Sequence, residues 1–474
     1  MFTAATVLLL VGCKGNGSSS AIPQSLTNWI WESGSNAANS SGNYSVAQGS
    51  ATATGQPSGR SNPMTWRDAS GQFWVFSGAG GASDMWKFNT TTLQWAWMSG
   101  TSITASSTAG HYPASSGLTS GALANLPGQR SGGATWVDAS GNLWMYGGYG
   151  TDSNGLIGYM NDLWFFNPTT NWWTWVSGSN QAGSLSAPCV WGGTTPPGTT
   201  AATNQPAPRS NAATWTDTTT GNFYMFGGQG YLSANSNCNG ANNADVQNDL
   251  WEFNPVTLTW TWLGGTQGFN ATGVYGKQNI ASATNQPGSR QSATTWTDKN
   301  GIFWMFGGRG IDGAGGNGYL NDLWKFDPVA AQWTWVNGSA TVNFVGAYGT
   351  NAVPAATNQP GSRYGGLGWV DTSGNLWLFG GYGINSTGTV VLLNDLWEYQ
   401  VSVGQWVWVN GSYNGNASSY YGTINVLSTG NMPGSRYGAS GWVDSAGNFW
   451  MYGGEGYDAI GTNGPLSDVW KFLP

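Results

Sequence analysis

The residue that most often performs acid–base and metal chemistry, histidine, occurs once in this chain of 474 residues, at His111 in an expected loop. Zinc sites need several ligands at set spacings, and the sequence has no cysteine–histidine cluster of that kind. No Gly-x-Ser-x-Gly motif stands between a strand and a helix, where it would present a nucleophile. We therefore expect no catalytic residues, no metal and no other cofactor. Whether any catalysis occurs stays open, with a binding role favoured.

Three aspartates, Asp152, Asp312 and Asp458, lie in segments rich in Asn and Gly. Calcium is bound by such oxygen ligands, but the ligand spacing of an EF-hand loop is absent. Aspartate also accepts hydrogen bonds from backbone N–H groups in turns. We expect these side chains to stabilise turns.

The first residues differ from the rest of the chain. The apolar stretch "TVLLLVGC" resembles a bacterial lipoprotein signal, with Leu10-Val11-Gly12-Cys13 as the lipobox. The resemblance implies cleavage before Cys13 and a diacylglycerol on its thiol, with residues 1–12 as signal peptide and 13–26 as flexible tether. No Lys or Arg precedes the apolar run, which departs from the usual signal pattern. We expect a lipid anchor on a bacterial envelope membrane, facing the periplasm or the cell surface.

Internal repetition is the strongest signal. One frame, as in "PGSRQSATTWTDKNGIFWMFGGRG", recurs six times, and in every copy Trp follows Arg by six positions and Asp follows it by eight. A second half such as "NDLWKFDPVAAQWTW" follows each copy, although the sixth stops after "SDVWKFLP". The frame arginines are Arg60, Arg130, Arg209, Arg290, Arg363 and Arg436. The aspartates of the second halves are Asp84, Asp162, Asp249, Asp322, Asp395 and Asp468.

Each copy is predicted to form four short strands. Turns such as "DASG" separate the first two strands, and the second strand alternates aromatic and aliphatic residues before a Gly-Gly pair. The two tryptophans of the fourth strand are two residues apart and therefore share one face. Four strands per repeat with a double glycine and periodic Trp are typical of a β-propeller. We predict an all-β fold with four antiparallel strands per blade.

The repeat resembles the Kelch family. The glycine pair Gly307-Gly308, the aromatic Phe326 and the later Trp333 follow one another in Kelch order, and the resemblance covers nearly everything from about residue 57 onward. It implies a propeller of four-stranded blades, with a period longer than the roughly 50 residues of a Kelch repeat. Copper oxidases of the galactose oxidase type resemble this scaffold, but their copper site needs two histidines. One histidine cannot supply it.

The N-terminal stretch "NWIWESGSN" matches the fourth strand that the sixth copy lacks. We therefore predict six blades, with residues 27–36 closing the last blade so that its outer edge does not stay open. The propeller would span 27–474. The expected blades cover approximately 57–100, 127–178, 206–265, 287–338, 360–411 and 433–474.

Most of the chemically distinctive residues recur once per blade. The 31 tryptophans fall mainly on repeat positions, where packing between blades explains them, and Trp191 is the clear exception. The frame arginines and the second-half aspartates are expected to pair structurally. The alternative is a ring of arginines near the channel mouth that attracts an anion.

One face of the propeller is expected to carry the long loops, and loops on a rigid scaffold are common binding sites. The position x of Gly-Gly-x-Gly leaves the second strand at this face and varies most between blades. We predict ligand binding there, with Ala79 the small member of the set. The candidate ligand-binding residues are Tyr149, Gln229, Arg309, Tyr382 and Glu455.

Cys189 and Cys238 are expected in two loops on the same face of the third blade, and outside the cytoplasm a disulfide between them would persist. The formal net charge of -7 disfavours a nucleic-acid partner. No apolar run reaches the roughly 18 residues of a membrane span, so membrane contact is expected through a lipid only.

Three functions remain open at this point. The favoured one is a non-enzymatic propeller that binds an unknown protein or glycan on the envelope. The second is a sugar-directed enzyme, such as a mutarotase resembling the six-bladed Kelch-type sialic acid epimerase, for which Arg309 and Glu455 are the only charged pair at the variable position. The third is a structural surface protein.

Overall fold

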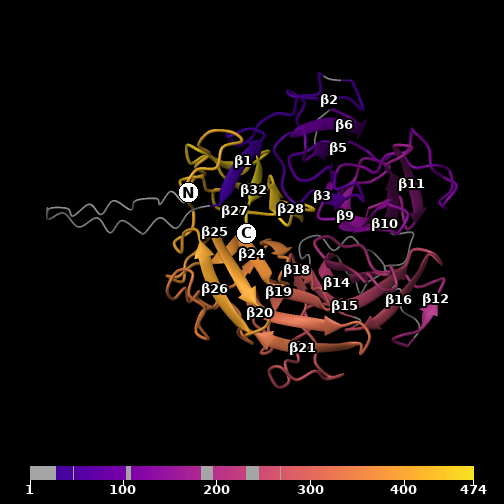
Figure 1. Cartoon of the computed structure of the whole chain (residues 1–474). Coiled ribbons are helices and arrows are strands. Elements are labelled where there is room, and N and C mark those ends of the chain that lie inside the picture. Colours follow the sequence, from indigo (N-terminus) through magenta and orange to yellow (C-terminus); the bar gives the residue numbers. More distant parts are fainter. Residues whose placement is uncertain (1–27, 46, 103–107, 183–195, 231–244, 267) are drawn as a thin grey trace, which may run out of the picture.

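The computed structural model describes residues 28–45, 47–102, 108–182, 196–230, 245–266 and 268–474. These residues form antiparallel sheets that stand side by side around a central axis (Figure 1). In the described parts of the chain there is no helix long and apolar enough to cross a membrane. The predicted all-β propeller with four antiparallel strands per blade is confirmed.

The first three blades are continuous in sequence, and each adds one short strand to its four main strands. Blade one contains β2 (Ala51–Thr52), β3 (Met64–Arg67), β4 (Phe73–Phe76), β5 (Asp84–Asn89) and β6 (Gln94–Gly100). Blade two contains β7 (Arg130–Ser131), β8 (Ala134–Val137), β9 (Leu143–Thr151), β10 (Ile157–Asn167) and β11 (Trp172–Ser177). Blade three contains β12 (Thr200–Ala201), β13 (Ala213–Thr216), β14 (Phe223–Gly230), β15 (Asp245–Asn254) and β16 (Thr259–Gly264).

Blades four and five repeat this plan, and blade six combines both ends of the sequence. Blade four contains β17 (Arg290–Gln291), β18 (Thr294–Thr297), β19 (Phe303–Ile311), β20 (Asn317–Asp327) and β21 (Gln332–Asn337). Blade five contains β22 (Arg363–Tyr364), β23 (Leu367–Val370), β24 (Leu376–Ile384), β25 (Val390–Gln400) and β26 (Gln405–Asn410). Blade six contains β28 (Ser440–Val443), β29 (Phe449–Tyr452), β32 (Val469–Phe472) and β1 (Trp29–Ser33), with a small sheet of β27 (Arg436–Tyr437), β30 (Glu455–Tyr457) and β31 (Asn463–Pro465).

The predicted closing strand is present. Strand β1, indigo in Figure 1, pairs antiparallel with the yellow β32, so that Trp29 lies opposite Phe472. The Trp29 side chain is fully buried, and Glu32 forms an ion pair with Lys471. Lys471 also lies over the ring of Trp450 at 5.2 Å. The side chains of β1 thus supply the packing that the last blade would otherwise lack.

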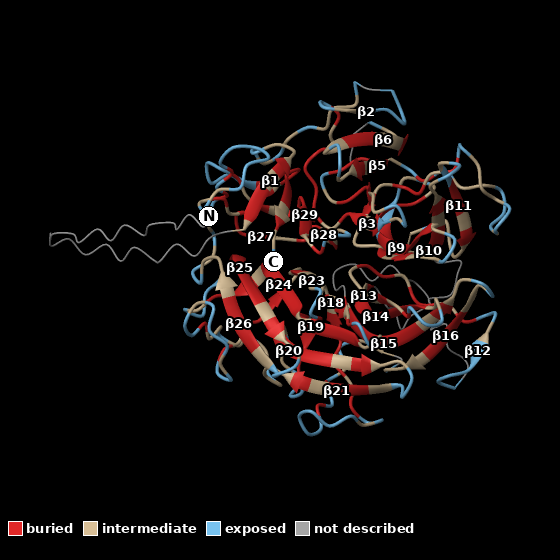
Figure 2. Ribbon diagram, viewed as in Figure 1, coloured by how far each residue is buried: buried red, intermediate tan, exposed pale blue. Residues whose placement is uncertain are grey.

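Tryptophans fill the spaces between neighbouring blades, where the strands are buried and the connecting loops are exposed (Figure 2). The Trp296 indole N–H donates to the Trp377 carbonyl of the next blade at 3.0 Å. At the junction of blades six and one, Trp442 stacks on Phe73 with ring centroids 3.6 Å apart, and Trp369 stacks in the same way on Phe449 between blades five and six. These contacts give most of the repeat tryptophans a packing role. Trp191 lies outside the described residues.

The linkers between blades contain more order than their Gly/Ser/Asn-rich sequences indicate. The linker before blade five runs along the outer strand β26, where Ala352 N–H donates to the Trp408 carbonyl at 2.8 Å. The buried Asn358 donates to the carbonyls of Val353 and Trp406 at 2.9 and 3.1 Å. This linker therefore covers a sheet edge that would otherwise present unpaired backbone groups.

Candidate functional site

A buried ion pair lies inside every blade. Arg290 and Asp322 form a two-pronged pair, with N–O distances of 2.6 and 2.8 Å, and Arg290 also donates to the Gly307 carbonyl. The Tyr275 hydroxyl and the Trp324 indole each donate to the same aspartate at 2.7 Å. Burial raises the pKa of Tyr275 above its usual value, and the charge of Asp322 adds to the effect.

All six frame arginines pair with the aspartate of their own blade and are at most 1% exposed in their side chains. In blade two the second terminal nitrogen of Arg130 bonds the Tyr112 hydroxyl instead of Asp162. Their charges are therefore neutralised inside the blades. The pairing predicted between the frame arginines and the second-half aspartates is present. The alternative of a ring of free arginines at the channel mouth does not fit this geometry.

The Gly-Gly pair lets adjacent blades approach closely. Gly307 has a φ of 64°, and a Cβ at this position would lie 2.7 Å from the carbonyl oxygen of Arg363 in the next blade. Blade one has Ser77 here, also with a positive φ of 52°. The Ser77 hydroxyl accepts a hydrogen bond from the Arg130 backbone N–H at 3.0 Å. Serine at this position therefore adds a hydrogen bond between blades one and two.

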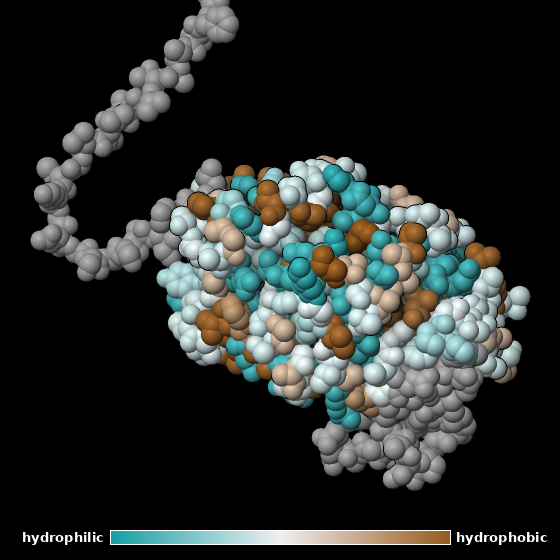
Figure 3. Space-filling view, turned by 90° about the horizontal axis from the view of Figure 1, so that it is seen from below, coloured by the Kyte–Doolittle hydropathy of each residue, from teal (hydrophilic) through white to brown (hydrophobic). Residues whose placement is uncertain are grey.

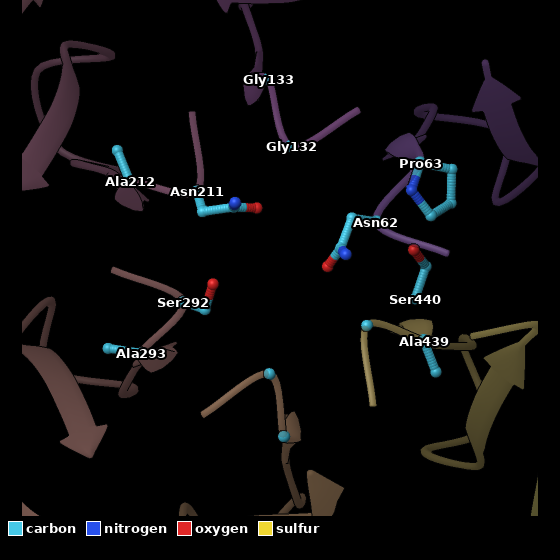
Figure 4. A pocket seen from close by; sticks show the side chains of 13 residues that line it. Asn62, Pro63, Gly132, Gly133, Asn211, Ala212, Ser292, Ala293, Ala439 and Ser440 are labelled. Carbon is cyan, nitrogen blue, oxygen red and sulfur yellow. The ribbon is translucent and has the colours of Figure 1, made fainter. Parts of the chain in front are cut away.

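A closed ring of backbone hydrogen bonds surrounds the central axis. In each blade the residue two positions after the frame arginine donates its N–H to the carbonyl of its counterpart in the preceding blade, at 2.7–2.9 Å. These residues line a cavity of about 170 Å³ in the central channel, and Asn62 and Asn211 point toward its centre (Figure 4). The ring consists of Asn62, Gly132, Asn211, Ser292, Gly365 and Gly438.

The predicted ligand-binding residues lie beside this ring. Each pairs across the sheet with the residue that directly follows the frame arginine: Tyr149 with Ser131, Gln229 with Ser210, Arg309 with Gln291, Tyr382 with Tyr364, and Glu455 with Tyr437. Tyr149 and Arg309 are exposed, and the other three are partly exposed. Two variable positions of each blade therefore lie next to the channel mouth, although Ser61 and Ser210 are buried there.

Four tyrosines, which we call the tyrosine platform, lie together at the mouth: Tyr319, Tyr364, Tyr382 and Tyr437. The rings of Tyr319 and Tyr364 are stacked with centroids 5.9 Å apart and planes 8° apart. Tyr364 contacts Tyr382 and Tyr437 at 5.7 Å in each case, and Tyr382 lies 6.2 Å from Tyr437. Tyr437 also packs on Gly365 of the backbone ring, where a Cβ would lie 3.3 Å from its ring.

Opposite charges flank the tyrosine platform. Arg309 lies across from Tyr319 in blade four, and Glu455 lies across from Tyr437 in blade six. Burial raises the pKa of Tyr364 to about 12, and the neighbouring tyrosines contribute. Burial also raises the pKa of Tyr437, with Glu455 adding to the effect. The raised pKa values keep the hydroxyls of Tyr364 and Tyr437 protonated, so both can donate hydrogen bonds.

The other half of the mouth has smaller side chains. The residues after the frame arginine are Ser61, Ser131 and Ser210 in blades one to three, and Ala79 occupies the variable position of blade one. Tyr149 contacts Tyr159 of its own blade, with centroids 4.9 Å apart. The aromatic and charged groups of the mouth therefore concentrate on blades four to six.

Other candidates from the sequence contribute less. Asp312 accepts backbone hydrogen bonds from Ala314, Gly316 and Val342 at 2.7–2.9 Å, which occupies its carboxylate in a turn. The exposed His111 lies in a linker segment that bridges to Leu126. In the described segments no group of three or more His, Cys, Asp or Glu residues could hold a metal ion. The predicted lipidation site Cys13 and the predicted disulfide between Cys189 and Cys238 lie outside the described residues.

Sequence reasoning found one variable position per blade and missed the other. The sequence did not predict Tyr319, Tyr364 and Tyr437 as site residues, because they lie outside the Gly-Gly-x-Gly motif. A signal was present: the residue after the frame arginine is Tyr in the fifth and sixth copies and Ser or Gln in the others. That change within an otherwise regular frame marks the same surface.

Comparison with known proteins agrees with the architecture. A family model described as the KLHDC2/KLHL20/DRC7 Kelch-repeats domain matches residues 122–343. No curated protein matches the chain.

Proposed function

The chain belongs to the Kelch-repeat family, and from this premise we propose that it is a non-enzymatic binding propeller displayed on a bacterial cell envelope. Its working surface is the long-loop face at the channel mouth, with Tyr149, Gln229, Arg309, Tyr382 and Glu455. One observation carries the proposal. The mouth is where blades that are otherwise nearly identical differ most in chemistry, and the difference gathers aromatic and charged side chains on blades four to six.

The composition of this surface fits protein recognition. Tyrosine and arginine are enriched at the centres of protein interfaces, where a few such residues provide most of the binding energy. The tyrosine rings are only partly buried and are fixed by packing against one another. A rigid, partly exposed aromatic surface loses little conformational entropy when it binds a partner.

Display on the envelope rests on the sequence around Cys13. A lipid on this thiol, followed by a tether, would hold the propeller at a membrane without any spanning segment. Mass spectrometry of the membrane fraction is expected to find a diacylated peptide that begins at Cys13. An intact N-terminal Met1 peptide on the soluble protein would contradict the anchor.

The face assignment can be tested with a photoreactive amino acid placed at either end of one strand. Arg309 lies near the end of β19, and Lys299 lies in the exposed turn before its start, on the opposite face. We expect crosslinks to a specific partner in envelope extracts from position 309 and none from position 299. Crosslinks only from position 299 would show that the working face is inverted.

The same protein can be tested for turnover of an anomeric sugar by NMR. The proposal expects no acceleration of mutarotation. The two charged residues that an acid–base mechanism would use, Arg309 and Glu455, stand on two different blades with blade five between them. Acceleration that disappears in Glu455→Gln would replace the binding function with the enzymatic one.

A further inference from the structure

We propose that the tyrosine platform, with Arg309 and Glu455 at its two ends, binds an extended proline-rich peptide segment of a partner protein, with an acidic and a basic side chain flanking the prolines. This inference rests on the proposed function and specifies the ligand class of the same face.

The packing shows that the tyrosines form a surface and not a cage. Tyr364, Tyr382 and Tyr437 have mutual centroid distances of 5.7–6.2 Å and interplanar angles of 58–67°. These are ordinary contact distances between aromatic rings, which lie about 4.5–7 Å apart. The rings therefore occupy the space between them, and a ligand has to lie across their exposed edges and faces.

The spacing of the rings matches an extended chain. Ring centroids lead from Tyr319 through Tyr364 to Tyr437 in two steps of 5.9 and 5.7 Å. A polyproline II helix rises about 3.1 Å per residue, so each step corresponds to about two residues. Proline rings pack well on aromatic surfaces, and a polyproline II segment is already extended before it binds. Four residues would cover the platform.

The phenol groups suit such a ligand as hydrogen-bond donors. A polyproline II segment has no internal hydrogen bonds, and its carbonyl groups stay free to accept. Burial keeps the pKa of Tyr319, Tyr364 and Tyr437 above the usual value for tyrosine, so each hydroxyl retains its proton. A peptide of prolines has carbonyl acceptors and no N–H donors, which matches a surface that donates.

The charges define what flanks the prolines. Arg309, beside Tyr319, would pair with an acidic side chain, and Glu455, beside Tyr437, would pair with a basic one. Within the described residues, neither Arg309 nor Glu455 forms a salt bridge. A ligand with one charge of each sign is therefore favoured over one with two like charges.

Three synthetic peptides of equal length test the proposal: four prolines flanked by aspartate and lysine, by two aspartates, or by two lysines. Their binding to the full chain is measured by calorimetry. The wild-type protein is expected to bind the mixed peptide best. Each mispaired charge in the other two peptides should lower the affinity by up to about fivefold, which is the usual contribution of an exposed ion pair. The mixed peptide is prepared with aspartate first and with lysine first, and the better binder of the two orders is used in the comparison.

Charge-reversal variants should change the preference in a defined way. Glu455→Arg is expected to favour the peptide with two aspartates, and Arg309→Glu the peptide with two lysines. Lys299→Glu, the matched control on the opposite face, should keep the wild-type order. Equal binding of all three peptides to wild type and both variants would overturn the proposal.

The platform itself is tested by Tyr364→Ala, which should weaken all three peptides by about thirtyfold, the scale of an interface hot spot. Tyr364→Phe keeps the ring and should lose less than fivefold, which separates binding from misfolding. Tyr420→Ala removes a tyrosine that is 60% exposed outside the platform and should have no effect. Replacing the prolines of the peptide by glycines should abolish binding.

Maltoheptaose provides the contrasting probe. If it binds in a manner that depends on Tyr364 while the peptides do not bind, the face is right and the ligand class is wrong. If neither probe binds, the peptide inference fails, and the crosslinking experiment at position 309 decides the proposed function separately.

Discussion

Arg363 and Tyr364 are consecutive residues that belong to different regions of the molecule. Arg363 is buried and forms a two-pronged pair with Asp395, at 2.6 and 2.8 Å. Tyr364 is partly exposed at the channel mouth and packs among other tyrosines. The interior network that contains Arg363 repeats one buried arginine–aspartate pair in all six blades, whereas the mouth changes from blade to blade. In this propeller, regularity marks the residues that hold the fold, and departure from regularity marks the candidate site.

The largest effect on stability is expected for the closing strand β1, which packs into the interior of the last blade from the other end of the sequence. Removing Trp29–Ser33 should abolish cooperative unfolding or cause aggregation, because β32 then presents an open edge and Trp470 loses its cover. Calorimetry and size-exclusion chromatography check this. A deletion variant that melts like the wild type and stays monomeric would contradict the closure.

The second effect concerns one interior arginine. Arg290→Met should lower the free energy of unfolding by about 3–5 kcal/mol, because it leaves Asp322 buried without its charge partner. Denaturant unfolding monitored by Trp fluorescence measures it. The double variant Arg290→Met with Asp322→Leu should recover part of the loss, since no lone charge remains. A single variant within about 0.5 kcal/mol of wild type would show that the network does not hold the blade.

A smaller effect depends on pH. Burial raises the pKa of Asp458, but backbone N–H donors from Ala38, Thr462 and Ile460 outweigh it, and the net pKa lies below the usual value. The native state therefore binds this proton less tightly than the unfolded chain. The stabilisation is present above the unfolded pKa of about 3.9 and is lost as the pH falls through the lower folded value.

The pH prediction is checked by comparing wild type with Asp458→Asn. The difference in unfolding free energy between them should be largest near neutral pH and should shrink as the pH falls below about 4. Denaturant titrations at several pH values measure it. A difference that stays constant down to pH 2 would show that Asp458 is not the titrating group.

The smallest effect on stability is expected at the mouth. Arg309→Ala and Glu455→Ala should change the free energy of unfolding by no more than about 0.5 kcal/mol, because surface substitutions away from special features rarely do more. The same variants should weaken partner binding. Arg290 is the matched residue for this variant, because both are arginines of blade four. A large loss of stability in Arg309→Ala would place it in the interior network.

Much of the fold could be predicted from the sequence because its repeats are explicit. The constant spacing from frame arginine to Trp and Asp indicated the strands and turns, and "NWIWESGSN" indicated the closing strand. The ion pairs could be anticipated because Arg and Asp recur together once per blade. The edge-covering linkers could not, because the Asn358 hydrogen bonds join a loop to the carbonyl of Trp406, 48 residues away.

The candidate site was predictable only in part. Tyr382 and Glu455 follow a glycine pair, so a motif located them. The platform needs Tyr319, Tyr364 and Tyr437 from three successive blades to meet, and this depends on the closeness of the blades at the mouth. The distance between neighbouring blades at the mouth cannot be read from the residue spacing within one repeat. It is set by the Gly-Gly pairs and by the ring of backbone hydrogen bonds.

The pairing of β1 with β32 also orders events during synthesis. Trp29 emerges from the ribosome before any of the six blades exists, and its partner Phe472 is made only after the other five blades. Contacts so distant in sequence cannot form until the intervening chain has been made. Strand β1 therefore stays unpaired, with its apolar side chains exposed, while the other five blades fold. A nascent chain that exposes an unpaired apolar segment for this long is expected to bind a chaperone that shields short hydrophobic stretches.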